Sequence, residues 1–400
     1  MRIADVVVVG GGPAGTAAAI SLARAGSDVV LVDKATFPRD KFCGDGLTTN
    51  ALRLLEKLGL DPTTVPSWKV IHAVNVRSPS GRLVQFPLPE GAGQYAVVAE
   101  RQELDNALVE LARKEGVDVL DGHACTGASE SRDGVVVMAE GVGEIAGGHA
   151  VAADGIWSPM RKYLGVHTPD YRGEWHAFRQ YFTNVSDRAA SELFVLFEPD
   201  FLPGYAWSFP LPGNRANVGF GIQRGHKQQI NEMKQLWQAL LQRPHIHEIL
   251  GPNSAPEGPY RSWPIPARID DITYATERTL FVGDAVGACD PMTGEGIAQA
   301  LHTGIRAAEA IAAGGEVTRR YSRAVERDLV ADHKMSTLLI RALKHRKGAR
   351  AGVRIAGLTA WTRRNFARWL FEDYPRAIIV TPRRWKRGMF TGPGAFRSEL

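Results

Sequence analysis

Ala4-Asp5-Val6-Val7-Val8-Val9-Gly10-Gly11-Gly12-Pro13-Ala14-Gly15 is the stretch of sequence that decides the fold. Its β-branched residues do not alternate with polar ones, which is typical of a parallel strand buried on both faces. The small residues from Thr16 to Ala25 predict a helix that ends at Gly26, and 29–32 predicts a second buried strand that ends at Asp33. Together they predict one strand–helix–strand unit of about 30 residues.

The glycines between the first strand and the helix have the spacing Gly10-x-Gly12-x-x-Gly15. Gly10 permits the tight turn, Gly12 lets the backbone approach a pyrophosphate, and Gly15 allows the helix to pack closely on the strand. The helix N-terminus offers N–H groups and a partial positive charge, and Asp33 can accept hydrogen bonds from ribose hydroxyls. The complete pattern predicts a bound dinucleotide, but it does not distinguish FAD from NAD.

The rest of the chain continues as α/β segments separated by β-rich segments. A region of alternating aromatic and polar residues, about 171–222, predicts an antiparallel sheet. The remaining expected elements are helices at 53–58, 102–115 and 297–313, strands at 70–77, 82–86, 117–120 and 279–282, and helix after about Arg319. This order predicts one nucleotide-binding domain interrupted by insertions.

Two later segments resemble the para-hydroxybenzoate-hydroxylase-like flavoproteins. Ala152–Arg161 resembles their Asp-Gly segment, and Phe281–Gly287 resembles their second FAD motif. Arg101 matches a family arginine near the FAD phosphates. The resemblance implies bound FAD, with Arg101, Asp154 and Asp284 among its contacts.

The fold class that this resemblance implies is α/β: a Rossmann-like FAD-binding domain, an inserted antiparallel substrate domain and C-terminal helices. The expected boundaries are 1–70, 98–165 and 272–325 for the FAD-binding domain, 71–97 and 166–271 for the substrate domain, and 326–400 for a basic helical region.

Gly294 and Gly296 open the expected helix 297–313. A helix N-terminus at this place can direct its partial positive charge at the pyrimidine end of a flavin. The alternative is a glycine-rich turn that only packs. Given FAD, we favour the flavin contact.

Two segments narrow the resemblance to the geranylgeranyl reductases. Phe37–Leu47 resembles the Cys-Gly loop of that family, and Tyr205–Pro210 followed by Gly219–Gly221 resembles its YxWxFP…GxG substrate motif. The resemblance implies reduction of C=C bonds in an isoprenoid chain of a lipid or quinone, by hydride transfer from reduced FAD. The sequence contains one dinucleotide motif, so we expect NAD(P)H or another electron donor to act transiently.

The side chains of these segments suit such a reaction. Tyr205, Trp207 and Phe209 share one face of a strand, where they form either an aromatic wall for an apolar chain or ordinary core. Saturating an alkene also needs a proton, and Cys43 could supply it or shape the cavity. A free cysteine is more often a small core residue.

Flavin-dependent halogenases are the main alternative. Gly204–Pro210 resembles the Gly-Trp-x-Trp-x-Ile-Pro motif of halogenases, and Phe37–Arg39 resembles the start of their Gly-Glu-Ser loop. Cys43–Gly46, which stands in place of that loop, departs from the halogenase pattern. An FAD monooxygenase or halogenase of an aromatic or polyketide-type metabolite is therefore the second hypothesis, since a fold does not fix a function. A carrier of prenyl lipids is the third, and the intact FAD motifs argue against it.

The net charge of the 400-residue chain is +5, but it is unevenly distributed. From Arg341 onward there are fifteen Lys or Arg and three acidic residues, a net of +12, which leaves −7 for the first 340 residues. We assigned Arg350, Arg354, Arg364 and Arg368 to one helical face, and expected Met335–Leu343 to pack as helix. This region is expected either to contact an anionic membrane surface or to cap the substrate domain. The acidic first 340 residues contain every FAD motif and the aromatic motif, and they are expected to account for catalysis without the basic region.

Composition excludes several classes of protein. Three scattered cysteines argue against a disulfide framework and a metal site, and no apolar run approaches the roughly 20 residues that span a bilayer. Only charge favours nucleic-acid binding, so no nucleic-acid partner is expected. We expect a cytoplasmic protein, peripheral at the inner membrane face if the basic region binds lipid.

Overall fold

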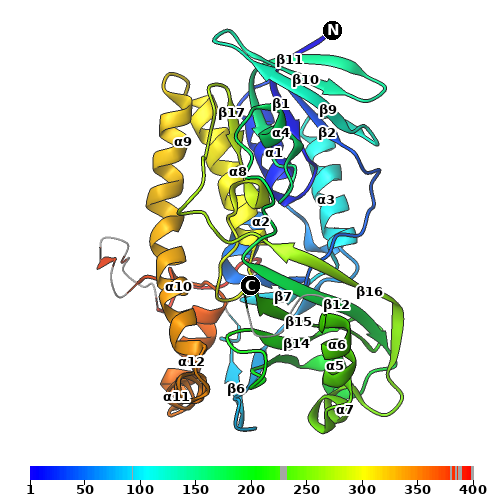
Figure 1. The fold of residues 1–400 in the computed structure, drawn as a ribbon, viewed down its shortest axis with the longest axis vertical. Helices are drawn as coiled ribbons and strands as arrows, with labels where there is room; N and C mark the ends of the chain where they lie inside the picture. Colours follow the sequence, from blue (N-terminus) through cyan, green and yellow to red (C-terminus); the bar gives the residue numbers. More distant parts are fainter. Residues whose placement is uncertain (92, 226–231, 379–380, 383–384, 386–389, 398–400) are drawn as a thin grey trace.

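The computed structural model places most of the chain. The structure describes residues 1–91, 93–225, 232–378, 381–382, 385 and 390–397. Figure 1 shows an α/β part that contains the N-terminus, a second β-rich part at the opposite end, and helices along one side of both.

The first sheet contains the predicted strand–helix–strand unit. Its parallel strands have the order β8-β2-β1-β11, with β17 beside the end of β11, and β10 and β9 extend it in antiparallel fashion. The strands are β1 (Arg2–Val9), β2 (Val29–Asp33), β8 (Asp118–Asp121), β9 (Cys125–Glu130), β10 (Val135–Ala139), β11 (Gly143–Ala152) and β17 (Thr279–Phe281). Val6–Val9 is buried, as expected for a strand covered on both faces.

Helices pack on this sheet through small residues. Helix α1 contacts α8 and α3. A Cβ atom at Gly304 of α8 would lie 2.2 Å from the Ala14 carbonyl oxygen of α1, so only glycine permits this approach. The helices of this part are α1 (Pro13–Arg24), α2 (Thr49–Lys57), α3 (Arg101–Lys114), α4 (Pro159–Tyr163) and α8 (Ile297–Ala312).

The second sheet is the main element of the β-rich part. Its strand order is β16-β12-β15-β14-β13-β5-β6, and only the β13–β5 pair is parallel. Its strands are β5 (Ala73–Arg77), β6 (Leu83–Pro87), β12 (Trp175–Thr183), β13 (Leu193–Leu196), β14 (Tyr205–Leu211), β15 (Arg215–Gln223) and β16 (Ala255–Ile265). The helices α5 (Asp187–Ser191), α6 (Met233–Leu241) and α7 (Pro244–Leu250) accompany it. The antiparallel sheet expected at 171–222 is therefore present.

A small antiparallel sheet lies where the two parts meet. It contains β3 (Gly46–Thr48), β7 (Ala96–Val98) and β4 (Lys69–Val70). β3 continues directly into α2, whose N-terminal Ala51 N–H is capped by the Thr48 side chain. This sheet fixes the loop that precedes Gly46 between the FAD motifs and the second sheet.

The C-terminal helices run from the first part to the second. In Figure 1, α9 (Val317–Val325) and α10 (Ala331–Leu343) descend along one side, and α11 (Arg346–Ala356) and α12 (Ala360–Leu370) lie at the end of β6. Val353, Ala356, Ala367 and Phe371 share a core with the β5–β6 hairpin. The structure therefore contains the helical cap that was one of the two expectations for this region.

Three predictions for this region were wrong. Helix does not continue to the end, because the described residues after Leu370 contain no α-helix. The four arginines that were predicted to share one helical face do not do so. The helix ends after α11 and a new one begins at α12, and Arg368 is buried beside Asp373. Leu338, assigned to the packed side of its helix, is 56% exposed. Residue spacing gave the helical period but not the position of the break.

Candidate active site

One cavity of about 1180 Å³ joins the two parts of the molecule. This volume exceeds the usual range of about 300–1,000 Å³ for a small-molecule pocket, so the cavity has room for a cofactor and a substrate. The predicted residues that line it are Gly10, Gly12, Asp33, Cys43, Arg101, Asp154, Tyr205, Trp207, Phe209, Asp284, Gly294 and Gly296. Gly15 does not line the cavity. The structure thus brings together segments that are up to 286 positions apart in the sequence.

The three motif glycines have different surroundings. Gly10 has a φ of +108°, and a Cβ atom there would lie 2.3 Å from the Ala153 carbonyl oxygen. A Cβ atom at Gly15 would lie 1.8 Å from the Gly10 carbonyl oxygen, so this glycine serves the packing of α1. At Gly12 the nearest atom would be Arg39 Nη2 at 3.7 Å. The backbone at Gly12 therefore faces open space in which a phosphate group would fit.

Two of the predicted carboxylates, Asp33 and Asp154, line the cavity and differ in their hydrogen bonds. Asp33 accepts hydrogen bonds from the Gly11 and Ala35 N–H groups, at 2.6 and 2.8 Å. Asp154 Oδ2 accepts from Met160 N at 2.8 Å, while its Oδ1 has no partner among the described residues. Burial raises the pKa of Asp154 to about 6. An unpaired buried acceptor of this kind fits a hydroxyl or amide donor of a ligand.

Cationic side chains surround the same region. Arg39, Lys41 and Arg101 line the cavity, and Asp105 binds both arginines. Burial lowers the pKa of Lys41. Sequence reasoning identified Arg101 and missed Arg39 and Lys41, although both lie in the segment Phe37–Leu47 that contains Cys43. Glycine backbone, a helix N-terminus and three cations form a donor set that fits the two phosphates of FAD.

The loop that contains Cys43 is fixed by the second sheet. The Cys43 carbonyl accepts from Arg179 Nε at 3.2 Å and from Asn217 Nδ2 at 2.9 Å. Asp45 accepts from Tyr181 and Asn217, at 2.8 and 2.7 Å. Burial raises the pKa of the Cys43 thiol to about 11, so the thiol is neutral at physiological pH. Its predicted role in the reaction stays a prediction.

The aromatic residues of β14 face this loop. Trp207 Nε1 donates to Asn217 Oδ1 at 3.0 Å, and Phe209 lies next to Gly44 and Gly46. A Cβ atom at Gly219 would lie 2.3 Å from Trp207 Cζ2, which explains the first glycine of the GxG segment. Tyr205, Trp207 and Phe209 therefore form a wall of the cavity; in addition, neighbouring rings contact each other at centroid distances of 6.1 and 6.2 Å.

The C-terminal helices form a second wall of the cavity. The cavity-lining residues of this region are Leu339, Ala342, Leu343, Gly348, Ala349, Gly352, Val353, Phe366, Trp369, Leu370 and Phe371. Residues after Arg341 thus contribute to the cavity lining, while the expectation that the first 340 residues account for catalysis stays a prediction. Small and apolar residues at helical spacing within a basic segment indicate a buried helix face. The spacing does not reveal whether that face packs against other protein residues or lines a cavity.

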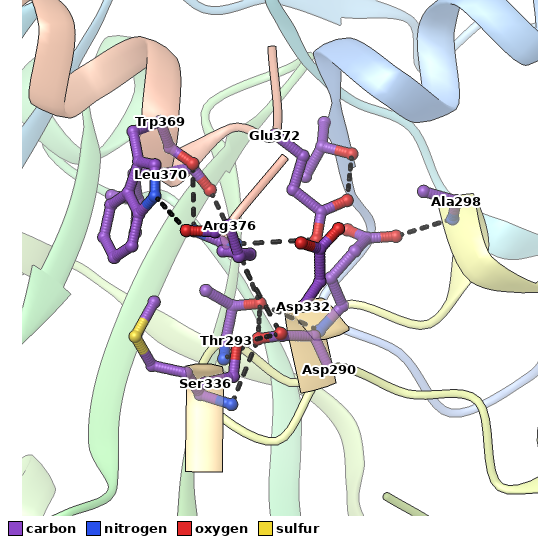
Figure 2. Close-up of polar contacts among 12 residues, drawn as sticks. Asp290, Thr293, Ala298, Asp332, Ser336, Trp369, Leu370, Glu372 and Arg376 are labelled. Carbon is purple, nitrogen blue, oxygen red and sulfur yellow. Dashed lines mark hydrogen bonds and ion pairs between the residues drawn. The ribbon is translucent and has the colours of Figure 1, made fainter. Parts of the chain in front are cut away.

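Buried charged residues lie behind this wall (Figure 2). Arg376 donates to the Trp369 carbonyl at 2.9 Å and the Leu370 carbonyl at 3.1 Å, and its Nη2 lies 3.5 Å from Glu372 Oε1. Its Nε lies 4.0 Å from Asp290 Oδ2. Sequence reasoning missed this cluster, because its members come from two segments about 80 residues apart.

Glu295 is the carboxyl of this cluster that reaches the cavity. It lies between Gly294 and Gly296, and its Oε1 accepts from the Ala298 N–H of α8 at 2.8 Å. Burial raises the pKa of Glu295 to about 7, and burial together with the charge of Glu295 raises that of Glu372 to about 8. The N-terminus of α8 therefore has an acidic side chain beside it. The predicted contact of Gly294 and Gly296 with a flavin stays a prediction.

Among the residues that the structure describes, no group of three or more His, Cys, Asp or Glu side chains could hold a metal ion. No helix in the same part of the chain has the length and apolar character needed to cross a membrane.

Comparison with known proteins decides the family. Residues 3–318 match the model of an FAD-binding domain family. The chain is 34% identical over 336 residues to the menaquinone reductase of Mycolicibacterium smegmatis. The aligned region covers 78% of this chain and 77% of the relative. It is a member of the geranylgeranyl reductase family. The enzyme is therefore an FAD-dependent oxidoreductase, as the motifs predicted.

A second relative agrees with this assignment, and a solved structure has the same fold. It is 32% identical over 321 residues to digeranylgeranylglycerophospholipid reductase 1 of Methanopyrus kandleri, covering 76% of this chain and 79% of the relative. The solved structure of a geranylgeranyl bacteriochlorophyll reductase-like protein from Thermoplasma acidophilum superposes with a TM-score of 0.80 at 20% identity, covering 96% of this chain and all of the other. The second likeness confirms the predicted fold class.

Proposed function

We propose that the enzyme saturates C=C bonds in the polyprenyl chain of a quinone or lipid. The observation that carries this proposal is a single apolar cavity in which the FAD motifs, the Cys43 loop and the aromatic face of β14 meet. The two relatives named for a quinone and for a glycerophospholipid differ in head group. A polyprenyl chain is the part that such substrates have in common.

Reduced FAD supplies a hydride when it is bound. The residues of the chain position the alkene: Tyr205, Trp207 and Phe209 offer an aromatic surface on one side, and helices α10–α12 offer aliphatic side chains on the other. Both walls exclude water from an apolar chain, and burial of that chain is favourable by about 25 cal/mol per Å². We propose that NAD(P)H or another electron donor binds transiently and reduces the FAD.

The monooxygenase or halogenase alternative has less support. Cys43–Gly46 departs from the halogenase pattern, and the relatives at 32 and 34% identity are reductases by name. The test reduces the FAD-loaded enzyme with dithionite under anaerobic conditions and adds a menaquinone with an unsaturated chain. Products that gain two hydrogens per bond support the reductase. Hydroxylated product or peroxide with NAD(P)H and oxygen, and no saturated chain, would overturn it.

The corner between α11 and α12 supports contact with an anionic membrane surface. Ile355, Leu358 and Trp361 are 61, 64 and 66% exposed there. Exposed cationic residues flank them at Lys347, Arg350, Arg354 and Arg364. Apolar side chains within a basic surface match the interface of an anionic bilayer. The inner faces of the same two helices line the cavity, so the substrate would be close to its source.

The test of this contact is flotation with vesicles. Replacing all three apolar side chains by serine should lower binding to vesicles of phosphatidylglycerol and phosphatidylcholine by at least about tenfold. Met138→Ser, at an exposed position of β10 near the other end of the molecule, is the matched control and should leave binding unchanged. Equal binding of the triple variant and the control would contradict the membrane contact.

A further inference from the structure

Hydride transfer to an alkene leaves one requirement unmet. The second carbon of the double bond must receive a proton, and the donor must lie in the cavity. Cys43 is in the cavity, but burial raises the pKa of its thiol to about 11. Tyr205 is also in the cavity, and burial together with the nearby carboxylates raises the pKa of its phenol further above its usual value. Both groups are weak acids for a reaction near neutral pH, where the best donor has a pKa close to that of the medium.

The carboxyl cluster behind the cavity holds more negative charge than it can neutralise. Asp290, Glu295 and Glu372 lie around one guanidinium, that of Arg376; Asp290, Glu295 and Arg376 are buried, and the Glu372 side chain is 9% exposed. Three ionised carboxylates would leave a net charge of −2 away from water, which is costly. At least one proton therefore stays within the cluster near neutral pH.

The hydrogen bonds show where that proton resides. Asp290 Oδ1 accepts from Met292 N, Thr293 N and Thr293 Oγ1 at 3.0, 2.8 and 2.8 Å, and its Oδ2 accepts from Ser336 Oγ. Both carboxylate oxygens of Asp290 are therefore satisfied by donors. Glu295 and Glu372 have fewer donors, and like charges so close together cannot both ionise readily. The proton is shared by these two glutamates.

We propose that Glu295 donates this proton to the alkene, and that Glu372 behind it shares the proton until it is used. Of the three carboxyls, Glu295 lines the cavity, between the two glycines expected at the flavin. The inference rests on the reductase function proposed above, and it assigns to Glu295 the role that the sequence analysis considered for Cys43.

The step is balanced as follows. A hydride carries two electrons from reduced FAD to one alkene carbon, the π bond breaks, and the proton of Glu295 bonds to the other carbon. Two C–H bonds form, FAD is left oxidised, and Glu295 is left as a carboxylate that regains a proton from solvent. NAD(P)H or the other electron donor returns FAD to its reduced form.

The pH dependence follows from the groups that face Glu295. From its own loop these are Cys289 and Asp290, from the segment after α12 Glu372 and Arg376, from the cysteine loop Cys43, and from β14 Tyr205. The pKa of Glu295 is raised to about 7 and that of Glu372 to about 8. The acid form is present below these values and is lost as the pH rises through them. The rate of saturation should therefore fall between about pH 7 and 8.

The experiment compares wild type with Glu295→Gln in single turnovers. Both proteins are loaded with FAD, reduced with dithionite and mixed anaerobically with a menaquinone that has an unsaturated chain. The expected result is a 10²- to 10⁴-fold slower saturation in E295Q, about the usual contribution of a general acid, with no pH step between 7 and 8. FAD content and melting temperature identify a variant that fails to fold, and Glu295→Asp then serves as the second variant, with slower turnover and a retained pH step.

Infrared titration provides a readout that does not depend on turnover. Wild type should show a protonated-carboxyl C=O band near neutral pH that shifts in D₂O, and E295Q should lose or weaken it. Wild-type rates and an unchanged pH profile in E295Q would overturn the inference while leaving the reductase function intact. Complete inactivity of the wild type toward polyprenyl chains would overturn the proposed function itself, and with it the proton donation.

Discussion

The two ends of the cavity are built from different parts of the polypeptide. The FAD end combines charged side chains with backbone at fixed positions: Gly10 and Gly12 supply close approach, and Gly15 lets α1 pack on β1. The substrate end consists of side chains from β14 and from α10–α12. A surface made of backbone needs glycine at fixed positions, whereas a surface made of side chains needs only apolar residues of suitable size. The first leaves a strong sequence signature and the second leaves a weak one.

The sharpest difference is expected within the glycine motif. Gly15→Ala places a Cβ atom 1.8 Å from the Gly10 carbonyl oxygen, so α1 must move away from β1. We expect the free energy of unfolding of the FAD-free protein to fall by about 3 kcal/mol. Urea denaturation followed by circular dichroism measures this change.

Gly12→Ala is the matched variant for this prediction. Its Cβ atom meets nothing closer than Arg39 Nη2 at 3.7 Å, so stability without FAD should hardly change. FAD affinity should fall, because the methyl group occupies space that the pyrophosphate would take. Equal stability losses in G12A and G15A would show that the motif has one structural role rather than two.

The substrate end should respond to the volume of its side chains. Leu339 of α10 lines the cavity, and its neighbour Leu338 is exposed. Leu339→Trp fills part of the cavity, so kcat/KM for a long polyprenyl chain should fall by at least about tenfold, and less for a two-isoprene chain. Leu338→Trp adds the same volume at the surface and should change neither value.

FAD content separates this effect from damage to the cofactor end. L339W should bind FAD as wild type does, since Leu339 belongs to none of the FAD motifs. If L339W reduced long and short chains equally well, helix α10 would not limit the space for the substrate. The proposed difference between the two ends of the cavity would then be wrong.

The fold was largely predictable from the sequence, for physical reasons that individual elements show. Val6–Val9 must be buried on both faces, and a strand of this kind with a glycine turn has few structural alternatives. The antiparallel sheet at 171–222 was predicted from alternation. The break between α11 and α12 was not, because Gly357 is compatible with both a helix and a helix end.

The candidate site was predictable where residues act locally. Asp33 directly follows β2, and the aromatic residues of β14 alternate within one strand, so short-range spacing identified both. The Glu295 cluster depends on Glu372 and Arg376, which approach only when the segment after α12 folds back. Arg53 and Arg368 bind Asp373 and hold that segment. Such contacts are decided by tertiary structure, and no spacing rule reports them.

The smallest effect is expected from a residue that connects the two ends, Glu372. Its pKa in the folded protein is raised to about 8 by burial, above the value near 4.5 of an unburied carboxyl, with Glu295 and Asp290 adding to the shift. A raised pKa means that ionisation favours the unfolded state. The stabilisation is therefore complete below about pH 4.5 and is lost as the pH rises toward 8. In the structure, Gln299 Nε2 donates to Glu372 Oε1 at 3.0 Å. The glutamine of Glu372→Gln stays neutral at every pH and can accept the same hydrogen bond.

The variant should therefore be more stable than wild type at pH 8, by about 1 kcal/mol, and equally stable at pH 4.5. Denaturation at a series of pH values measures the difference. Glu316→Gln, at an exposed position before α9, is the control and should follow wild type at every pH. A pH-independent gain in E372Q would mean that the amide packs better, without any proton on Glu372. A stability gain confined to high pH would instead establish that the substrate end stores a proton at the cost of stability.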